Sequence, residues 1–211
     1  MRRAVLFDVG GPIDMEFARE MAIDSAIAAA CGMEGIRIDQ AAIDEASERA
    51  VEAFAADACV HMIETLCGDR RTIERVRQRV QAITGNLDVF QLRPDIEGLL
   101  RKLRELGLTL GAATAERGRL EQAGLGDLFV YGDPGVPPAE CILVGDRIDI
   151  DIGPARALGM ATIRFRTGRH RRQKPRSSAE TPDVDVTDVA ELEAAILALS
   201  AATSRSAPPS A

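Results

Sequence analysis

Asp8 is the residue best placed for chemistry in this chain. It ends the apolar run from Ala4 to Phe7 and is followed by Gly10 and Gly11. Asp is depleted inside strands, and two glycines let the backbone turn sharply and come close to a ligand. In open α/β sheets, ligands bind where strands end, so this carboxylate is a candidate reactive group. The alternative interpretation is an Asp that starts a turn by accepting backbone hydrogen bonds.

Two further polar groups follow apolar runs in the same way. Thr114 comes after Thr109 to Ala113, and the segment Gly145 to Asp151 comes after Cys141 to Val144. That segment carries the carboxylates of Asp146, Asp149 and Asp151. A lone Thr at the end of a strand is usually a turn residue, so a role for Thr114 depends on the other motifs.

These positions imply a sheet that brings the polar groups to one edge. The apolar runs are short and suit strands buried on both faces, as in a parallel sheet covered by helices; a fourth run is Thr162 to Phe165. Helices are expected over 95–106, 154–158 and from Asp188 through Leu199, with Asp188 and Glu191 as a capping box. The sequence therefore predicts an α/β fold with a Rossmann-like parallel sheet.

A long helical segment separates the first two strands. Residues 14 to about 85 show helical periodicity throughout, whereas a crossover between parallel strands needs only about a dozen residues. We expect an inserted helical bundle, either purely structural or a lid over the site. The predicted domains are an α/β core over 1–13 and 88–199, a helical cap over 14–87, and a disordered tail over 200–211.

Composition narrows the classes of partner. The chain has no Trp, one Tyr and six Phe, which disfavours aromatic stacking on single-stranded nucleic acid. Four cysteines without CxxC spacing, and no long apolar segment after the N-terminus, predict a reduced, cytoplasmic protein that does not bind membranes. Cys59, His61 and Cys67 are close in sequence, yet such residues in an amphipathic helix more often pack than bind metal. The sequence does not predict an oligomeric state.

Positive charge is concentrated in one segment. Arg164 to Arg176 contains seven Arg and Lys and no acid, although the whole chain has a net charge of −7. This segment fits a solvated loop, an electropositive entrance for an anionic substrate, or a docking patch for an acidic partner.

Taken together, Asp8, Thr114 and the run from Gly145 to Asp151 resemble the motifs of the haloacid dehalogenase-like superfamily, whose helical cap the insertion also resembles. The resemblance spans about residues 2–199. It implies hydrolysis of phosphate esters of small metabolites, with Mg²⁺ as cofactor. Most members use an aspartate nucleophile that forms an aspartyl-phosphate.

The resemblance assigns roles residue by residue. Asp8 matches the nucleophile and, with Asp146, Asp151 and the backbone carbonyl of Gly10, a magnesium ligand; Asp149 is an alternative to Asp151. Thr114 matches the hydroxyl that binds the phosphoryl oxygens. Gly11 and Arg147 complete the expected substrate contacts.

Two departures from the family pattern bear on turnover. The family has a second Asp, its general acid and base, where this chain has Gly10; such a group typically contributes about 10²–10⁴ in rate. Asp14 is the nearest spare carboxylate, and we expect it at the hinge of the insertion. The family also places a lysine before the Gly-Asp motif, in a segment that is nearly absent here, and Phe129 to Tyr131 is at best an edge strand.

The missing lysine can be checked against the other cations. Lys102 and Lys174 are the two lysines of the chain. Lys102 lies about halfway along a helix that leads away from the site, which makes it a poor replacement. Lys174, Arg147 and Arg117 are the remaining candidates.

Three functions are therefore considered. The first is a slow, magnesium-dependent phosphatase. The second is a catalytically impaired relative that binds metal, phosphate or a partner without turnover. The third, metal-independent dehalogenation, is disfavoured because it needs the missing basic residue and has no use for the cluster of acids.

Overall fold

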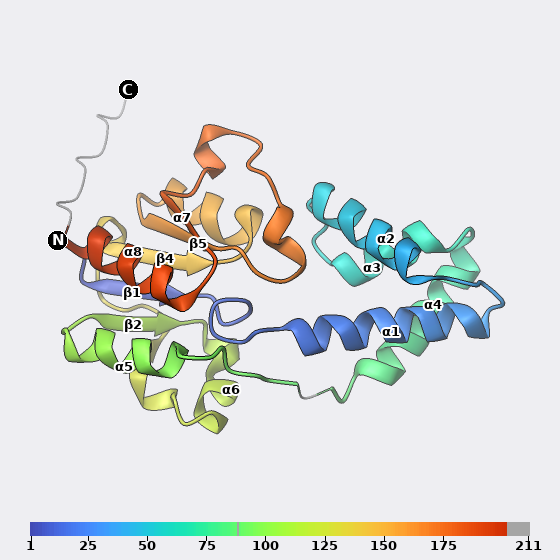
Figure 1. Cartoon of the computed structure of the whole chain (residues 1–211), viewed down its shortest axis with the longest axis horizontal. Helices are drawn as coiled ribbons and strands as arrows, with labels where there is room; N and C mark the ends of the chain where they lie inside the picture. The colour runs from blue at the N-terminus through green and yellow to red at the C-terminus, as the bar shows by residue number, and fades with distance from the viewer. Residues whose placement is uncertain (88, 202–211) are drawn as a thin grey trace. The chain divides into compact units, whose positions relative to one another are not determined.

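The chain forms two compact units. The computed structural model describes residues 1–87 and 89–201, apart from the side chain of Thr114. One unit, here called the α/β unit, consists of Met1–Met15 and the chain from Phe90 onward; the other, the helical unit, is Glu16–Val89. Figure 1 shows the elements of each. The expected domain boundary at residue 88 lies outside the described residues.

The α/β unit is built on a six-stranded sheet with the order β3-β2-β1-β4-β5-β6, in which every pairing is parallel. The strands are β1 (Ala4–Phe7), β2 (Thr109–Ala112), β3 (Phe129–Tyr131), β4 (Cys141–Gly145), β5 (Ala161–Phe165) and β6 (Val184–Val186). This confirms the predicted α/β fold, including the edge position of β3.

Strand β6 is absent from the sequence-based prediction. It is three residues long and has the exposed Asp185 at its centre, so it lacks the apolar run that marks the other strands. As an edge strand it needs only one apolar side chain pointing inward, which is Val186. A short edge strand of this kind leaves almost no periodic signal.

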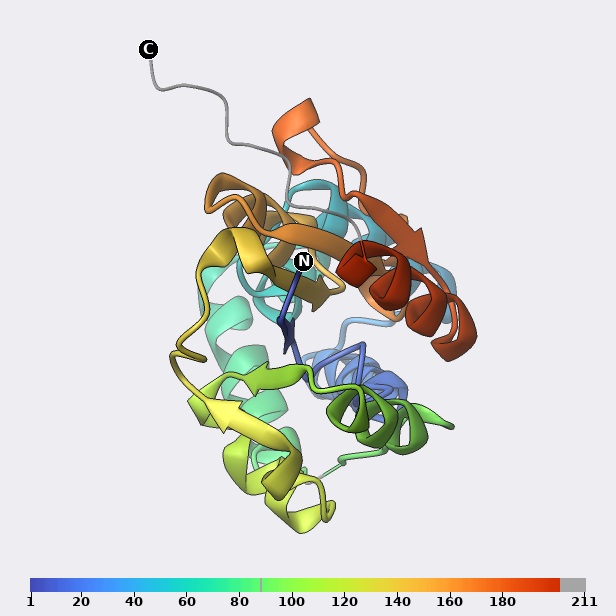
Figure 2. The same cartoon turned by 90° about the vertical axis from the view of Figure 1, so that its left-hand side faces the viewer.

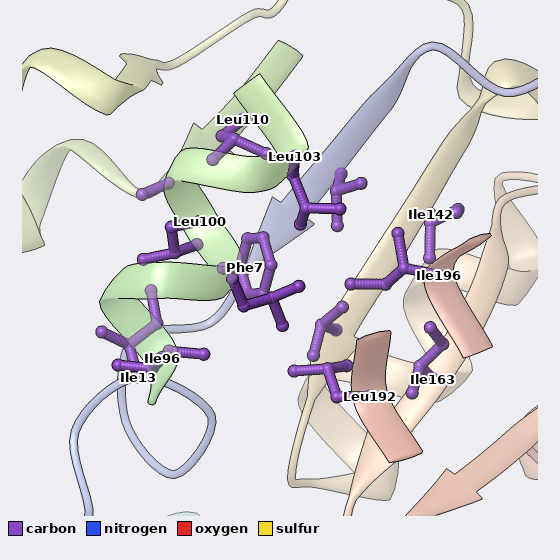
Figure 3. Close-up of a cluster of buried hydrophobic side chains, with 14 of the residues drawn as sticks. Phe7, Ile13, Ile96, Leu100, Leu103, Leu110, Ile142, Ile163, Leu192 and Ile196 are labelled. Atoms are coloured by element: carbon purple, nitrogen blue, oxygen red, sulfur yellow. The ribbon is translucent and has the colours of Figure 1, made fainter. Parts of the chain in front are cut away.

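Helices α5 (Ile96–Glu105) and α8 (Val189–Ala201) lie on the same side of the sheet, as Figure 2 shows. Their apolar faces meet strand residues such as Phe7 and Ile142 in the main core, shown in Figure 3. Asp188 caps α8 by accepting a hydrogen bond from the backbone N–H of Glu191 at 2.8 Å. The helix runs to Ala201, so Ser200 and Ala201 do not belong to the expected tail, and residues 202–211 lie outside the described part.

The remaining helices of this unit are short. They are α6 (Arg117–Gln122) and α7 (Gly153–Ala157), which follow β2 and β4 with one intervening turn each. Between β3 and β4 the chain forms only a 3-10 turn, Pro138–Glu140, as the short spacing predicts. The segment in which the family carries its lysine is therefore reduced to a loop.

The helical unit contains α1 (Phe17–Met33), α2 (Gln40–Glu52), α3 (Ala58–Leu66) and α4 (Arg70–Thr84). Asp39, Asp57 and Asp69 cap α2, α3 and α4 through side-chain hydrogen bonds to backbone N–H groups. The unit has its own apolar core, in which Cys31 and Cys67 are buried with their sulfurs 3.9 Å apart. Cys67 therefore packs rather than joining Cys59 and His61 in a metal site.

Two linker segments pair at the point where the chain leaves and re-enters the α/β unit. The backbone N–H of Met15 donates to the carbonyl of Gln91 at 2.9 Å, and that of Arg93 donates to the carbonyl of Ile13 at 2.8 Å. Asp14 is buried between them, and its Oδ1 accepts from the N–H of Gln91 at 2.9 Å. Asp14 thus braces the hinge, which is the position the sequence predicted for it.

Candidate active site

Three carboxylates gather at the carboxyl edge of the sheet. Asp8 follows β1, and Asp146 and Asp151 follow β4; each offers one oxygen, and these oxygens lie within 4.8 Å of one another. The N–H of Asp8 donates to the carbonyl of Val144 at 2.8 Å, which extends the β1–β4 ladder to Asp8. The structure thus brings together the three side chains that the sequence singled out.

A π-helical turn, Ile148–Ile152, carries Asp151 back toward the strand it follows. The backbone N–H of Arg147 donates to Oδ2 of Asp151 at 2.9 Å and fixes the carboxylate. Burial raises the pKa of Asp151 to about 6, in spite of that hydrogen bond. A wider turn of this type is often found at functional sites, and here it aims the third carboxylate at the cluster.

Asp149, the alternative to Asp151, faces a different set of partners. It forms an ion pair with Arg147 at 2.6 Å, with both side chains 13% exposed, and it accepts a hydrogen bond from Nε2 of Gln173 at 3.0 Å. Burial opposes its ionisation, but the hydrogen bonds from Arg147 and Gln173 outweigh burial and lower the pKa of Asp149. The geometry therefore favours Asp151 over Asp149 as a metal ligand.

The turn after Asp8 lies directly against Asp146. Gly11 has φ of 82°, and a Cβ at this position would be 3.0 Å from Cβ of Asp146 and 3.1 Å from Cγ2 of Thr167. A side chain would thus meet both a strained backbone conformation and two neighbours. Glycine is required here so that the turn, Asp146 and the loop after β5 can meet.

Arg93 holds this turn, and sequence reasoning missed it. Its Nε donates to the carbonyl of Gly11 at 3.1 Å, and its Nη2 donates to the same carbonyl and to Oγ1 of Thr167 at 2.9 Å. The residue follows the inserted helices in sequence, far from the motifs. The Arg93-Pro94 pair indicates that a new helix begins nearby, but it does not indicate which atoms the arginine side chain contacts.

Three of the four cations considered as replacements for the missing lysine have ionic partners. Lys102 forms an ion pair with Glu193 on α8, and Arg117 pairs with Glu121 at 2.7 Å while its guanidinium lies 5.3 Å from the centre of the Tyr131 ring. Arg147 is bound to Asp149. Lys174 is exposed in the loop after β5. The expected contact of Arg147 with substrate stays a prediction.

The basic segment, Arg164 to Arg176, is hydrogen-bonded to two of the segments that form the site. Gln173, which is 3% exposed, accepts a hydrogen bond from the N–H of Ile148 at 2.7 Å and so ties the segment to the turn after β4. Thr167 ties it to Arg93 and the turn after β1. Several of its arginines donate to carbonyls of the same segment, among them Arg164 to that of His170 at 2.8 Å.

Thr114 and Gly10 lie in the turns that follow β2 and β1. Thr114 begins the 3-10 turn Thr114–Glu116 after β2, but its side chain lies outside the described residues. Gly10 lies in the turn after Asp8, bridged to Asp14. Because the Asp14 carboxylate accepts from the N–H of Gln91, the structure gives it a bracing role at the hinge.

A groove of about 670 Å³ lies between α5 and α8 and shares Arg93 with the site. It is lined by the first turns of both helices, including Asp95, Asp188 and the ion pair between Lys102 and Glu193. None of the three clustered carboxylates lines it. The groove therefore adjoins the candidate active site at Arg93 but does not contain the carboxylate cluster.

A family model described as HAD-hydrolase-like matches residues 112–192, the part of the chain that includes Asp146 and Asp151. Over that segment the chain is similar to haloacid dehalogenase-like hydrolases. Two curated relatives are glyceraldehyde 3-phosphate phosphatases. The one from Methanopyrus kandleri is 31% identical over 125 residues, covering 47% of this chain and 54% of the relative. The one from Methanocaldococcus jannaschii is 37% identical over 78 residues, covering 34% of this chain and 33% of the relative.

The chain spans about half the length of the first relative and a third of the second. Solved structures resemble it over almost its full length. A predicted phosphoglycolate phosphatase from Haemophilus somnus 129pt has a TM-score of 0.66 at 17% identity, covering 94% of this chain and 97% of that one. A hydrolase from Deinococcus radiodurans R1 with bound phosphate and sodium has a TM-score of 0.62 at 20% identity, covering 93% and 96%. At these identities the likeness shows the fold.

Proposed function

We propose that this protein is a slow, Mg²⁺-dependent phosphatase of small phosphorylated metabolites that forms an aspartyl-phosphate on Asp8. The observation that carries the proposal is the cluster of Asp8, Asp146 and Asp151 at the carboxyl edge of the sheet. The phosphatase relatives support the reaction class.

The donor set fits a magnesium ion. Three carboxylate oxygens within 4.8 Å repel one another when ionised, and hard oxygen ligands are those that Mg²⁺ prefers. Asp8, Asp146 and Asp151 would hold the ion, with the carbonyl of Gly10 as the further ligand that the family resemblance implies. When bound, the ion offsets the negative charge that the carboxylates and the phosphoryl group bring together.

The chemistry of the chain itself has two stages. A carboxylate oxygen of Asp8 attacks phosphorus, a new O–P bond forms, and the ester O–P bond breaks to release an alkoxide that takes up a proton. Water then attacks the phosphorus of the aspartyl-phosphate, which frees inorganic phosphate and regenerates Asp8. Thr114 and Gly11 are proposed to bind the phosphoryl oxygens.

The proton for the leaving group is the weak point of this site. Gly10 has no side chain, and the carboxylate of Asp14 is hydrogen-bonded in the hinge. The leaving alkoxide must therefore take its proton from water, which favours esters whose leaving groups need little protonation. This is the reason for expecting slow turnover of alkyl phosphates.

The experiment measures phosphate release from a panel of phosphate monoesters, with Mg²⁺ or with EDTA, for the wild type and for Asp8→Asn. Asp127→Asn, the same substitution at an exposed position, is the matched control. We expect release that needs Mg²⁺, falls at least about 10³-fold in Asp8→Asn and is unchanged in Asp127→Asn. Release that survives Asp8→Asn, or none from any ester, contradicts the proposal.

The second candidate is a non-catalytic relative that binds metal or phosphate. Gly10 and the hinge contact of Asp14 favour it, because neither residue offers the leaving group an acid. Binding of Mg²⁺ and inorganic phosphate without turnover of any ester would support this alternative.

The cellular setting is also a proposal. The four cysteines are free, in keeping with a reducing cytoplasm. None of the helices described combines the length and apolar character that a membrane span requires.

A further inference from the structure

Arg93 lies at the meeting point of three segments that are distant in sequence. It is the fourth residue after the helical unit, and its backbone N–H donates to the carbonyl of Ile13 at 2.8 Å. Its side chain contacts the turn after β1 and the loop after β5. Arg93 lies outside the motifs around Asp8, Thr114 and Asp146.

The guanidinium makes a forked contact with the turn after Asp8. Nε and Nη2 both donate to the carbonyl of Gly11, the residue that packs against Asp146. Fixing this carbonyl fixes the plane of the peptide that follows it. It thereby adds a restraint to the Gly10–Gly11 turn, whose glycines have few intrinsic limits on their backbone angles. The turn that carries a proposed metal ligand, the Gly10 carbonyl, thereby acquires one orientation.

The guanidinium is itself held in place. Its carbon lies 4.4 Å from the centre of the Phe165 ring, and Nη2 reaches Thr167 at 2.9 Å. Burial lowers the pKa of Arg93, while the charges of Asp14 and Asp146 oppose this shift. A half-buried cation with stacked and hydrogen-bonded surroundings is a rigid anchor rather than a mobile surface group.

We infer that Arg93 is a positioning residue of the metal site: it locks the Gly10–Gly11 turn against Asp146 and so holds the backbone that completes the carboxylate cluster. The inference goes beyond the proposed function, since it concerns metal binding and does not need turnover. The charge and the hydrogen bonds of Arg93 have opposite effects on the affinity for a divalent cation. As a charge alone, Arg93 repels a divalent cation; as a brace, it favours binding by keeping the ligands in place.

The test measures the affinity of the protein for Mn²⁺, a hard cation that can be followed by electron paramagnetic resonance. Arg93→Gln removes the fork and the charge, Arg93→Lys keeps the charge but not the fork, and Thr167→Val removes one acceptor while Arg93 stays. Arg101→Gln, whose arginine pairs with Glu97 on the exposed side of α5, is the matched control.

We expect Arg93→Gln to weaken Mn²⁺ binding about tenfold even though it removes a positive charge, Arg93→Lys and Thr167→Val to weaken it about threefold, and Arg101→Gln to leave it unchanged. Unchanged or tighter binding by Arg93→Gln overturns the inference, because it shows that the arginine acts as a charge alone. If Arg93→Gln does not fold, wild-type affinity in both Arg93→Lys and Thr167→Val overturns it.

Urea unfolding in EDTA separates positioning from a general role in stability. A variant that loses stability but binds Mn²⁺ like the wild type contradicts the inference. The outcome is also distinct from that of the proposed function. A wild type that binds Mn²⁺ but hydrolyses no ester removes the phosphatase and leaves this test intact, whereas an active enzyme whose Arg93 variants bind Mn²⁺ normally removes only the inference.

Discussion

Asp151 occupies the space in which any side chain at Gly145 would lie. A Cβ at Gly145 would be 2.5 Å from Cβ and 2.7 Å from Oδ2 of Asp151. Gly145 alternates along β4 with Ile142 and Val144, whose side chains are in the core with α5 and α8. The turn that carries Asp151 therefore packs on the opposite face, and the glycine allows its carboxylate to return to the strand end.

Gly145→Ala should displace Asp151 from the cluster. The expected result is about tenfold weaker Mn²⁺ binding and a loss of about 1–3 kcal/mol in the free energy of unfolding, because the methyl group overlaps the aspartate. Titration with Mn²⁺ and urea unfolding measure the two quantities. Gly98→Ala is the control: it lies in α5 with open space around it and should gain about 0.5–1 kcal/mol. Wild-type Mn²⁺ affinity in Gly145→Ala would contradict the packing argument.

Asp151→Asn and Asp149→Asn should affect different properties. Asp151→Asn removes a cluster carboxylate and is expected to weaken Mn²⁺ binding about 10–100-fold. Asp149→Asn leaves Arg147 without its ionic partner, so we expect a loss of about 2 kcal/mol in stability and a change in Mn²⁺ affinity of no more than about threefold. Equal effects of the two substitutions on Mn²⁺ binding would show that the geometry does not separate these carboxylates.

Gly10→Asp should raise turnover of alkyl phosphates. It places a carboxyl group two residues after Asp8, where the resemblance expects the general acid, and Gly10 is not among the described glycines with positive φ. A gain of up to about 10²–10⁴ in kcat is expected for alkyl esters and little gain for p-nitrophenyl phosphate, whose leaving group needs no proton. Gly10→Asn has nearly the same shape but no acid. An equal gain in that variant would mean that acid catalysis is not the cause.

His170 should make the protein less stable in mild acid. Burial, together with the charge of Arg147, lowers its pKa to about 4. Between pH 6.5 and 4 the unfolded chain takes up a proton that the folded protein does not, so stability falls as pH falls. From pH 7 to pH 5 the wild type should lose about 1–2 kcal/mol more than His170→Gln, measured by urea unfolding. Equal losses would show that His170 titrates normally.

The apolar runs predicted the sheet because strands buried on both faces leave a strong, short signal. The periodicity of the insertion predicted its helices, and the structure adds the aspartate caps of three of them. The sequence also placed Asp8, Asp146 and Asp151 at strand ends, and the topology brought them together. The sequence did not predict β6, because the buried Val186 beside the exposed Asp185 is too short a pattern to indicate a strand.

The contacts that orient the site could not be predicted in the same way. The choice between Asp149 and Asp151 depends on a π-helical turn whose extra residue changes which carboxylate points inward. The contact from Arg93 to Gly11 joins residues 82 positions apart in sequence. Both depend on how side chains pack in three dimensions, which periodicity and spacing do not encode.

The backbone hydrogen bond between Met15 and Gln91 brings the two ends of the inserted helical unit together. The chain leaves and re-enters the α/β unit at two residues that are joined by a hydrogen bond. The entropic cost of closing the loop between them grows only slowly with the length of the insertion. Sequence between these two points can be lengthened, shortened or exchanged while Asp8, Asp146 and Arg93 keep their supports. Changes within the helical unit therefore need not displace the carboxylate cluster of the α/β unit.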